Sequence, residues 1–131
     1  MPAGKLTPAQ YELMQVVWNF GKDGATVAEV WQAVSEQRSV GRTTILNLLD
    51  RLEKRGWLRR HEQVGVNRYV ATVDRDRTDA ELARGFVQEF FGGSAANMVM
   101  SLLGSAELDA AEIQRLRKLL ANASARQERQ R

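Results

Sequence analysis

The fold is decided by one stretch, "GRTTILNLLDRLEKRGWLRR", which runs from Gly41 to Arg60. Apolar residues recur in it at helical spacing and predict a helix over about residues 41–55 with one buried face, made of Ile45, Leu48, Leu49 and Leu52. The opposite face carries Arg42, Thr43, Leu46, Asn47, Asp50, Arg51 and Lys54. A solvated helix face normally favours Glu and Lys, because Thr and Asn are poorer helix formers. Since Thr, Asn and Arg side chains reach base edges and phosphates, this face indicates a helix that contacts DNA.

Two capping boxes predict two helices before this one. In Thr7-Pro8-Ala9-Gln10 the threonine caps the helix, the proline takes the first helical position and the glutamine can return the bond, so a helix runs to about Phe20. Thr26-Val27-Ala28-Glu29 repeats the pattern and starts a second helix, which "SEQRSVG" interrupts. Gly56 follows the helix over residues 41–55 and is a natural glycine at its C-terminal end.

After Gly56 the pattern changes from helical spacing to strict alternation. "WLRRHEQ" and "NRYVATV" are typical of short strands, and "VGV" joins them with Gly65 at or near the tip of a hairpin. Three helices followed by a hairpin form a winged helix, which is a variant of the helix-turn-helix. The sequence therefore predicts a mainly α fold with a small β-hairpin, and a winged-helix DNA-binding domain over residues 1–73. Winged helices also serve as protein-interaction modules, so the fold alone leaves that alternative open.

A helical region is predicted over residues 74–122. Its pattern passes through Leu82 and Phe86 and stops at Gly92-Gly93-Ser94. A short helix, "AANMVMSLL", and a last amphipathic helix, within "ELDAAEIQRLRKLLANA", are expected after that. Residues 123–131 are expected to be a disordered tail, because "SARQERQR" is charged and lacks large apolar side chains.

The helical region carries more apolar surface than it can bury by itself. About fifty residues in three helices do not easily close a core of their own. We therefore predict a homodimer, in which a second copy of the chain covers this surface. The residues predicted at the dimer interface are Phe86, Phe90, Met98, Leu102, Leu103, Leu116 and Leu120. The alternative is that they pack back onto the first three helices.

The excess positive charge lies in the first part of the chain. Residues 1–73 hold ten Lys and Arg against seven Asp and Glu, a balance of +3, whereas residues 74–131 hold nine of each. Within residues 41–68, seven basic residues stand against three acidic ones, a balance of +4. A basic region of this kind is expected around a nucleic-acid-binding helix, although charge alone does not distinguish it from a basic solvated surface.

The candidate site residues follow from how helices read DNA. Groove-reading helices contact bases through their N-terminal residues, which predicts base contacts from Arg42, Thr43, Leu46 and Asn47. Contacts with phosphates or through the wing position the protein on the DNA without reading the base sequence. We predict such contacts from Thr44, Arg51, Lys54 and Arg68. Asp50 is expected to lie near the edge of the contact or to pair with a neighbouring base, because a phosphate repels a carboxylate.

Several other classes of function are disfavoured. Carboxylates are scattered, with no nucleophile–base constellation and no phosphate-binding glycine loop, so we do not expect an enzyme. The chain has no cysteine and one histidine, and neither a metal site nor a cofactor is expected. No apolar run reaches the roughly 18 residues of a membrane span and no signal peptide is visible, which predicts a cytoplasmic protein. His61 is expected to be exposed and without a role, and the core is expected to hold Trp18, Trp31 and Trp57.

Six segments together resemble the penicillinase repressor (BlaI/MecI) family across nearly the whole chain. They are "LTPAQYELMQVVW", "TVAEVWQAV", "RTTILNLLDRLEKRGWLRR", "NRYVATV", "FFGGS" and "LDAAEIQRLRKLL". The resemblance implies a homodimeric winged-helix transcriptional repressor that dimerises through its C-terminal helices. It also implies a double-stranded, palindromic DNA operator that overlaps a promoter. A DNA-binding protein without a specific site remains the third alternative, and the Thr, Leu and Asn side chains of the 41–55 helix argue against it.

The resemblance also bears on how such a repressor is released. Family members that control β-lactam resistance are cleaved at an Asn-Phe bond after a membrane-bound metalloprotease receptor senses the drug. Those positions align with Ser101-Leu102, where this sequence departs from the pattern. The copper-responsive branch of the family carries a C-terminal cysteine cluster, and a chain without cysteine excludes copper sensing by that route. Release by a regulatory protease or by disruption of the dimer is expected, with no bond assigned.

Overall fold

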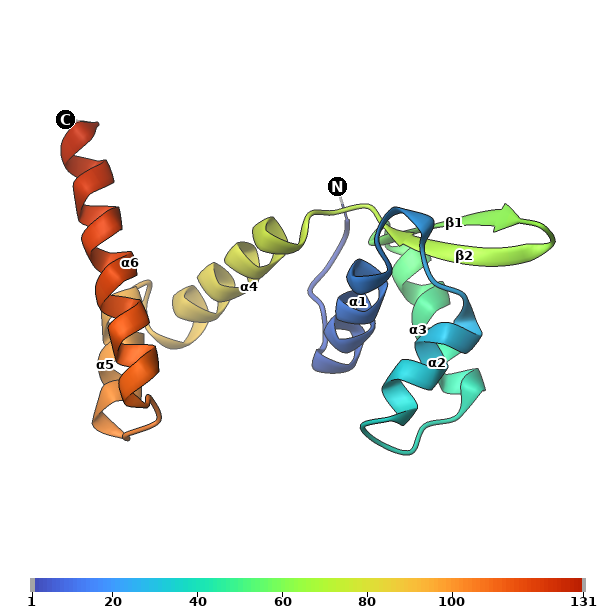
Figure 1. Cartoon of the computed structure of the whole chain (residues 1–131), viewed down its shortest axis with the longest axis horizontal. Helices are drawn as coiled ribbons and strands as arrows, with labels where there is room; N and C mark the ends of the chain where they lie inside the picture. The colour runs from blue at the N-terminus through green and yellow to red at the C-terminus, as the bar shows by residue number, and fades with distance from the viewer. Residues whose placement is uncertain (1, 131) are drawn as a thin grey trace. The chain divides into compact units, whose positions relative to one another are not determined.

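A computed structural model describes residues 2–130 and has the predicted order of elements (Figure 1). The first part holds three helices and a hairpin: α1 (Pro8–Phe20), the short 3-10 helix η1 (Gly21–Asp23), α2 (Val27–Ser35), α3 (Arg42–Lys54), β1 (Leu58–Gln63) and β2 (Val66–Ala71). The second part is helical and consists of α4 (Arg75–Phe90), α5 (Ala95–Gly104) and α6 (Ala110–Arg129). The predicted class, mainly α with a small β-hairpin in a winged-helix arrangement, is confirmed.

Both predicted capping boxes form and fix the starts of α1 and α2. The Gln10 backbone N–H donates to Thr7 Oγ1 at 3.2 Å, and the Thr7 N–H donates to Gln10 Oε1 at 3.1 Å. Thr26 and Glu29 repeat the exchange at 3.1 and 2.9 Å. Each box satisfies two backbone donors that the first turn of a helix leaves without an intrahelical partner, so these sequences begin their helices at defined residues.

The core of the first part lies between α1, α2, α3 and the base of the hairpin. Its fully buried side chains include Leu13, Met14, Val17, Val30, Val34, Ile45, Leu49, Leu52 and Tyr69. Leu48 differs from the prediction, because it is half-buried and packs against this core rather than within it. The buried stripe of α3 is therefore Ile45, Leu49 and Leu52, and the face beside Leu46 is left open.

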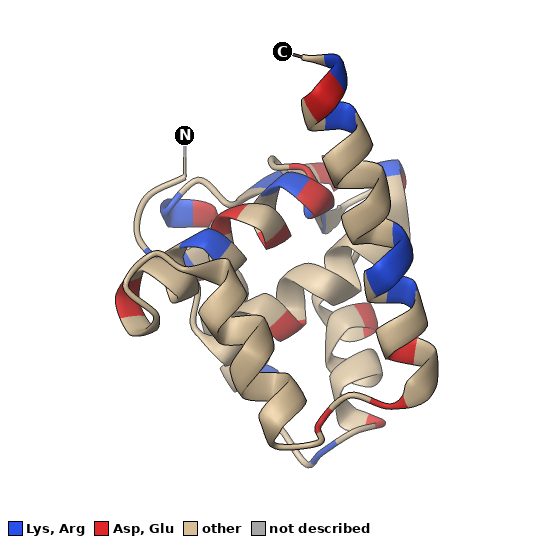
Figure 2. Ribbon diagram, turned by 90° about the vertical axis from the view of Figure 1, so that its left-hand side faces the viewer, with Lys and Arg blue, Asp and Glu red and all other residues tan. Residues whose placement is uncertain are grey.

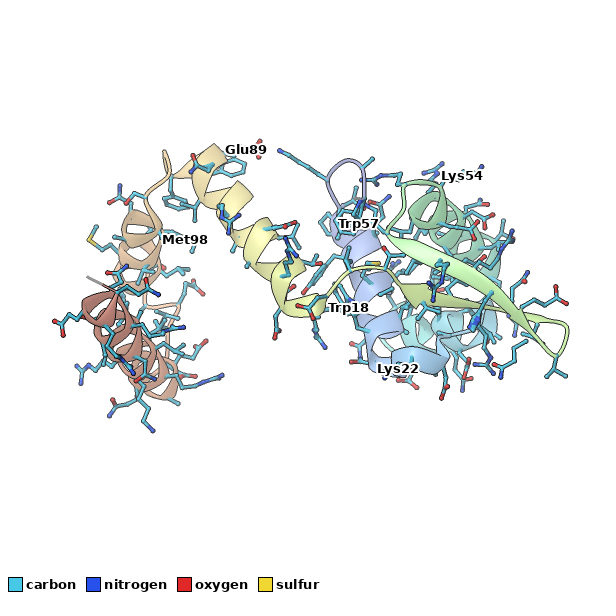
Figure 3. The ribbon with its side chains drawn as sticks, turned by 90° about the horizontal axis from the view of Figure 1, so that it is seen from above. Trp18, Lys22, Lys54, Trp57, Glu89 and Met98 are labelled. Atoms are coloured by element: carbon cyan, nitrogen blue, oxygen red, sulfur yellow. The ribbon has the colours of Figure 1, made fainter. Side chains whose placement is uncertain are left out.

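Of the three tryptophans predicted in the core, only Trp57 is buried. Trp18 and Trp31 lie at the rim, half-buried, and their indole N–H groups donate to the carbonyl oxygens of Val73 at 3.0 Å and Val40 at 2.8 Å. The prediction was wrong for these two because an indole combines a large apolar ring with one polar N–H, and the rim satisfies both. In Figure 3, Trp18 lies on α1 beside the connection that leads into α4.

The hairpin is antiparallel and is anchored to the helices at its base. Its register runs from Leu58 opposite Ala71 to Gln63 opposite Val66. The prediction of Gly65 at the tip is confirmed, since Val64 and Gly65 form a two-residue turn and both have positive φ, 52° and 75°. At the base, Ala25 and Tyr69 exchange backbone hydrogen bonds of 2.9 and 2.8 Å.

Gly24 makes that base possible. Its φ is 76°, and a Cβ at this position would meet the Tyr69 carbonyl oxygen at 2.6 Å. Glycine is therefore required both by the left-handed backbone and by the close approach of β2.

The chain divides into two compact units, Met1–Glu81 and Leu82–Arg131, and the division falls within α4. The sequence placed a boundary after residue 73, where the alternating pattern ends. The first turns of α4 group with the first unit through their contacts: Tyr11 Oη donates a hydrogen bond to Asp79, Arg75 donates to Asn19 at 3.4 Å, and Thr78 is buried.

The second unit holds the end of α4 together with α5 and α6. Ser94 caps α5, and a capping box of Asp109 and Glu112 starts α6. Acidic and basic residues are mixed along α6, whose C-terminal end is marked in Figure 2. A disordered tail was expected over residues 123–131, but α6 reaches Arg129, so residues 123–129 are helical, and Arg131 lies outside the described residues. The reason is propensity: Ala, Arg, Gln and Glu are good helix formers and extend an existing helix without any apolar contact.

No helix within residues 2–130 is long and apolar enough to cross a membrane.

Candidate nucleic-acid interface

The four residues predicted to read bases lie together on the exposed face of α3. Arg42, Thr43, Leu46 and Asn47 are all exposed, and their spacing of three or four residues places them on one side of the helix. Leu46 is 40% exposed, whereas its neighbour Ile45 is fully buried, so Leu46 is outside the core. Within residues 2–130, the side chains of Thr43 and Asn47 have no hydrogen-bond partner. This face therefore offers an apolar side chain, a hydroxyl and an amide with free hydrogen-bonding capacity.

Arg42 stands at the first position of α3, and its guanidinium lies over an aromatic ring. Its guanidinium carbon lies 4.7 Å from the centroid of the Trp31 ring. The N-cap of α3 is Gly41, which supplies no side-chain acceptor, in contrast to the capping boxes of α1 and α2. The first turn of α3 also has no acidic residue. Sequence reasoning selected Arg42 but not Trp31, which lies eleven residues earlier on α2.

The residues predicted to contact phosphates lie along the same helix. Thr44, Arg51 and Lys54 are exposed, and in the described part of the chain Arg51 and Lys54 form no ion pair. Figure 3 labels Lys54 at the end of α3. Their charges are therefore available to a polyanion.

Three other basic residues of the region 41–68 are bound within the protein. Arg55 donates to the Ala3 carbonyl at 2.9 Å, to the Lys5 carbonyl at 2.6 Å and to Gln10 Oε1 at 3.0 Å, and so fastens the N-terminal segment. Arg60 pairs with Glu53 at 3.2 Å. Their charges contribute to the local field, while some of their N–H groups are engaged by partners within the protein.

Arg68, the third of these, was predicted to contact DNA from the wing. It is half-buried, lies 3.4 Å from Glu29 Oε1 and donates to the Gly24 carbonyl at 3.5 Å. Glu29 also completes the capping box of α2 by accepting from the Thr26 N–H, so one carboxylate joins the start of α2 to the hairpin. Arg59, which sequence reasoning did not select, is exposed on β1 and, within residues 2–130, has no ion pair. The basic pair in "WLRR" was the feature of the sequence that could have identified Arg59.

Asp50 connects α3 to the hairpin. It is half-buried and accepts a hydrogen bond of 3.3 Å from Tyr69 Oη. Burial raises the pKa of the Tyr69 phenol, and the neighbouring Asp50 carboxylate adds to the shift. The hydrogen bond gives this carboxylate a partner inside the protein, and it holds the hairpin against the helix that carries the candidate readers.

His61 differs from its prediction. It is half-buried rather than exposed, and its Nε2 atom is buried without a hydrogen-bond partner among residues 2–130. On β1 it stands opposite Arg68. Residues 2–130 contain no group of three or more His, Cys, Asp or Glu placed to hold a metal ion.

The second unit presents the apolar surface that was predicted for dimerisation. A groove of about 280 Å³ between α5 and α6 is lined by Met98, Val99, Leu102, Leu108, Glu112, Arg115, Leu116 and Leu119. Three of the predicted residues therefore line one groove. Leu103 and Leu120 are exposed, and at the end of α4 the rings of Phe86 and Phe90 lie exposed with their centroids 4.9 Å apart.

Comparison with known proteins identifies the same architecture. The profile of a family described as "Penicillinase repressor" matches residues 6–122. Penicillinase repressors of Staphylococcus aureus and Bacillus licheniformis are 24% and 27% identical over 116 residues; the matches cover 88% of this chain and 90% and 89% of the relatives. The solved DNA-binding domain of the repressor BlaI is 28% identical with a TM-score of 0.50, and the match covers 57% of this chain and 90% of that one.

Proposed function

This chain belongs to the penicillinase repressor family, and we propose on that premise that it is a transcriptional repressor that binds double-stranded DNA through the exposed face of α3. The relatives are named as repressors and not as enzymes. The observation that carries the proposal is the stripe of Thr43, Leu46 and Asn47, which is exposed and in which the Thr43 and Asn47 side chains have no hydrogen-bond partner within residues 2–130.

Each residue of the stripe has a recognition chemistry of its own. In the major groove, the Asn47 amide both donates to and accepts from the edge of an adenine, and the Leu46 methyl groups contact a thymine methyl. Thr43 donates or accepts through its hydroxyl, and Arg42 presents a planar fork to guanine. Asn47 lies one turn after Thr43, so the four residues span the N-terminal half of α3, which is the part of a reading helix that meets the bases.

Phosphate contacts set the position of this helix on the duplex. Thr44, Arg51 and Lys54 are exposed, and their side chains have no hydrogen-bond or ion-pair partner within residues 2–130. Arg68 reaches a phosphate only by leaving Glu29, and that exchange costs little because exposed or half-buried ion pairs contribute about 0–1 kcal/mol. Such contacts give affinity that weakens with salt and carries no sequence information.

The protein acts as a homodimer in this proposal, with a second copy covering the groove of α5 and α6. One reading helix per subunit then requires an inverted-repeat operator. Joining two readers makes the second half-site contact intramolecular, which raises the overall affinity without any new contact. Repression follows from occupancy of the promoter. Disruption of the helical unit, by a regulatory protease or by another means, separates the readers and lowers affinity without altering α3.

The test is a gel-shift experiment with the DNA upstream of the protein's own gene and a scrambled duplex of equal length, at about 150 mM salt. Non-specific binding is then expected near 10⁻⁴–10⁻⁶ M, and a tighter shift on the native DNA alone supports the proposal. Equal binding to both duplexes contradicts site-specific repression and favours non-specific binding. No binding to either favours a protein-interaction module.

Asn47→Ala sharpens the test. Loss of the amide is expected to cost about 1–3 kcal/mol on the operator and nothing on the scrambled duplex. Gln32→Ala, which removes an exposed amide on α2 rather than on α3, is the matched control and is expected to bind as the wild type does. Equal losses by Asn47→Ala on both duplexes would remove Asn47 from the set of base readers.

A further inference from the structure

We propose that Trp31 is a positioning residue for DNA reading: its ring holds the Arg42 guanidinium in place before DNA arrives, and this makes Arg42 selective for a guanine. The inference rests on the proposed function and adds a residue outside α3 to the recognition site. It is carried by the stacking of Arg42 on Trp31 and by the fixed orientation of the Trp31 ring.

The ring of Trp31 is held from two sides. It packs against the hydrophobic core of the first unit, and its indole N–H donates to the Val40 carbonyl at 2.8 Å. Val40 lies in the loop between α2 and α3, two residues before Arg42. The same hydrogen bond therefore fixes the ring and the backbone from which α3 starts.

The ring is the group that holds Arg42. The guanidinium carbon lies 4.7 Å from the ring centroid, within the range of about 6 Å over which a cation is attracted to an aromatic face. Some other arginines of the first unit pair with carboxylates, as Arg38 does with Glu12, Arg60 with Glu53 and Arg68 with Glu29. Arg42 has no such pair among residues 2–130.

Helix stability does not explain why an arginine occupies the first turn of α3. A cation in the first turn faces the positive end of the helix dipole, and the first turn of α3 has no acidic residue to compensate. An arginine at this position is therefore unfavourable for the helix alone. Stacking on Trp31 offsets that disadvantage and leaves the side chain exposed to solvent.

The contact with the ring leaves N–H groups of the guanidinium free, since Arg42 is exposed and its guanidinium donates no hydrogen bond within residues 2–130. A guanidinium that lies on an aromatic face keeps the N–H groups of its plane directed outward, and two of them match the O6 and N7 acceptors of guanine. A mobile arginine loses rotamer freedom when it forms this pair, whereas a stacked one has lost part of it already. Trp31 is expected to increase the preference for guanine over the other bases.

The experiment begins by selecting duplexes from a randomised pool with the wild-type protein. Affinities are then measured for the selected duplex and for its single-base variants. We expect the wild type to prefer guanine at one position of each half-site by about tenfold or more. Arg42→Ala is expected to remove this preference. Trp31→Leu is expected to reduce it at least threefold at the same position and to leave the other positions unchanged, and Trp31→Phe is expected to keep most of it, because the aromatic face remains.

Two further variants separate positioning from folding. Trp18→Leu is the matched control, because Trp18 is also half-buried, also donates its indole N–H to a carbonyl and also lies under an arginine, Arg75, at 5.9 Å. It is expected to leave every base preference unchanged. The double variant of Trp31→Leu and Arg42→Ala is expected to show the base preferences of Arg42→Ala alone.

The outcomes are distinguishable. A uniform loss at all positions with Trp31→Leu, or a guanine preference that Trp31→Leu leaves intact, overturns the inference while the proposed function stands. A wild-type protein that selects no sequence overturns the proposed function, and the inference falls with it.

The contact between Arg42 and Trp31 can also be tested by NMR on the wild-type protein, so that this test does not depend on whether a variant folds. The δ-methylene protons of Arg42 should resonate upfield of their usual positions because of the Trp31 ring current. Ordinary chemical shifts for these protons would overturn the inference.

Discussion

Replacing Val64 by asparagine is expected to make the winged-helix unit more stable. Val64 is the first residue of the two-residue turn at the tip of the hairpin, with φ at 52°, and Gly65 follows with φ at 75°. A two-residue hairpin turn with both φ values positive favours Asn-Gly, whereas a β-branched residue fits the left-handed region poorly. The side chain of Val64 is 96% exposed, so its replacement removes no packing.

The size of the gain follows from these two facts. The left-handed conformation costs an ordinary L-residue about 1–2 kcal/mol, and asparagine avoids most of that cost because its short side chain bonds locally. With no packing lost, we expect a gain of about 1 kcal/mol. For a cooperative unit of about 80 residues, this corresponds to a rise in Tm of about 4–8 °C.

Thermal unfolding followed by circular dichroism measures the effect, with Val66→Asn as the control. Val66 is two residues further along, also exposed, but lies in β2 and has no positive φ. There, asparagine only loses strand propensity, so the Tm of Val66→Asn should not rise. A Val64→Asn protein with an unchanged or lower Tm, or equal shifts for the two variants, would refute the reasoning from backbone conformation.

Three further predictions concern the core, the tyrosines and the helical unit. Leu49→Ala removes a fully buried side chain and should destabilise the winged-helix unit by about 2–5 kcal/mol in urea unfolding; a cost below 1 kcal/mol would mean that the site is loosely packed. Both tyrosines should ionise late in a titration at 295 nm: the hydrogen bond to Asp79 raises the pKa of Tyr11, and burial raises that of Tyr69. A folded pKa above the unfolded value means that their stabilising contribution is complete below about pH 10 and is lost as the pH rises through the folded pKa, and half-ionisation of both at pH 10 would contradict this. Leu103→Asp places a charge on the apolar surface of α5 and should yield monomers in sedimentation, whereas a variant that still sediments as a dimer would exclude Leu103 from the interface.

The features predicted well from the sequence are the local ones. A capping box is complete within four residues, so Thr7 with Gln10 and Thr26 with Glu29 could be recognised without the fold. The same holds for the stripe of α3, because helical spacing alone separates Leu46 from Ile45 and Leu49. The helical extent of α6 was also readable, since the composition of residues 123–129 favours a helix. It was missed because the lack of large apolar side chains was taken as the stronger signal.

The features that were missed depend on pairs far apart in the chain. Arg55 and Gln10 are 45 residues apart, and Arg68 and Glu29 are 39 apart. A sequence shows that these residues are charged or polar, but not that they meet. For this reason the sequence could not show that three basic side chains of the region 41–68 are bound within the protein instead of free. Trp31 was assigned to the core for a related reason, because hydrophobicity does not reveal that its ring faces an arginine.

The backbone bridge between Ala25 and Tyr69 has a consequence for the newly made chain. These residues are 44 positions apart, and Tyr69 is itself a fully buried core residue. A nascent chain that has released α1, α2 and α3 from the ribosome therefore carries α3 on an open core. The core closes only when β2 has emerged, since contacts between distant residues cannot form before both exist. The order of synthesis therefore delays the closing of the core around α3 until the hairpin has been made.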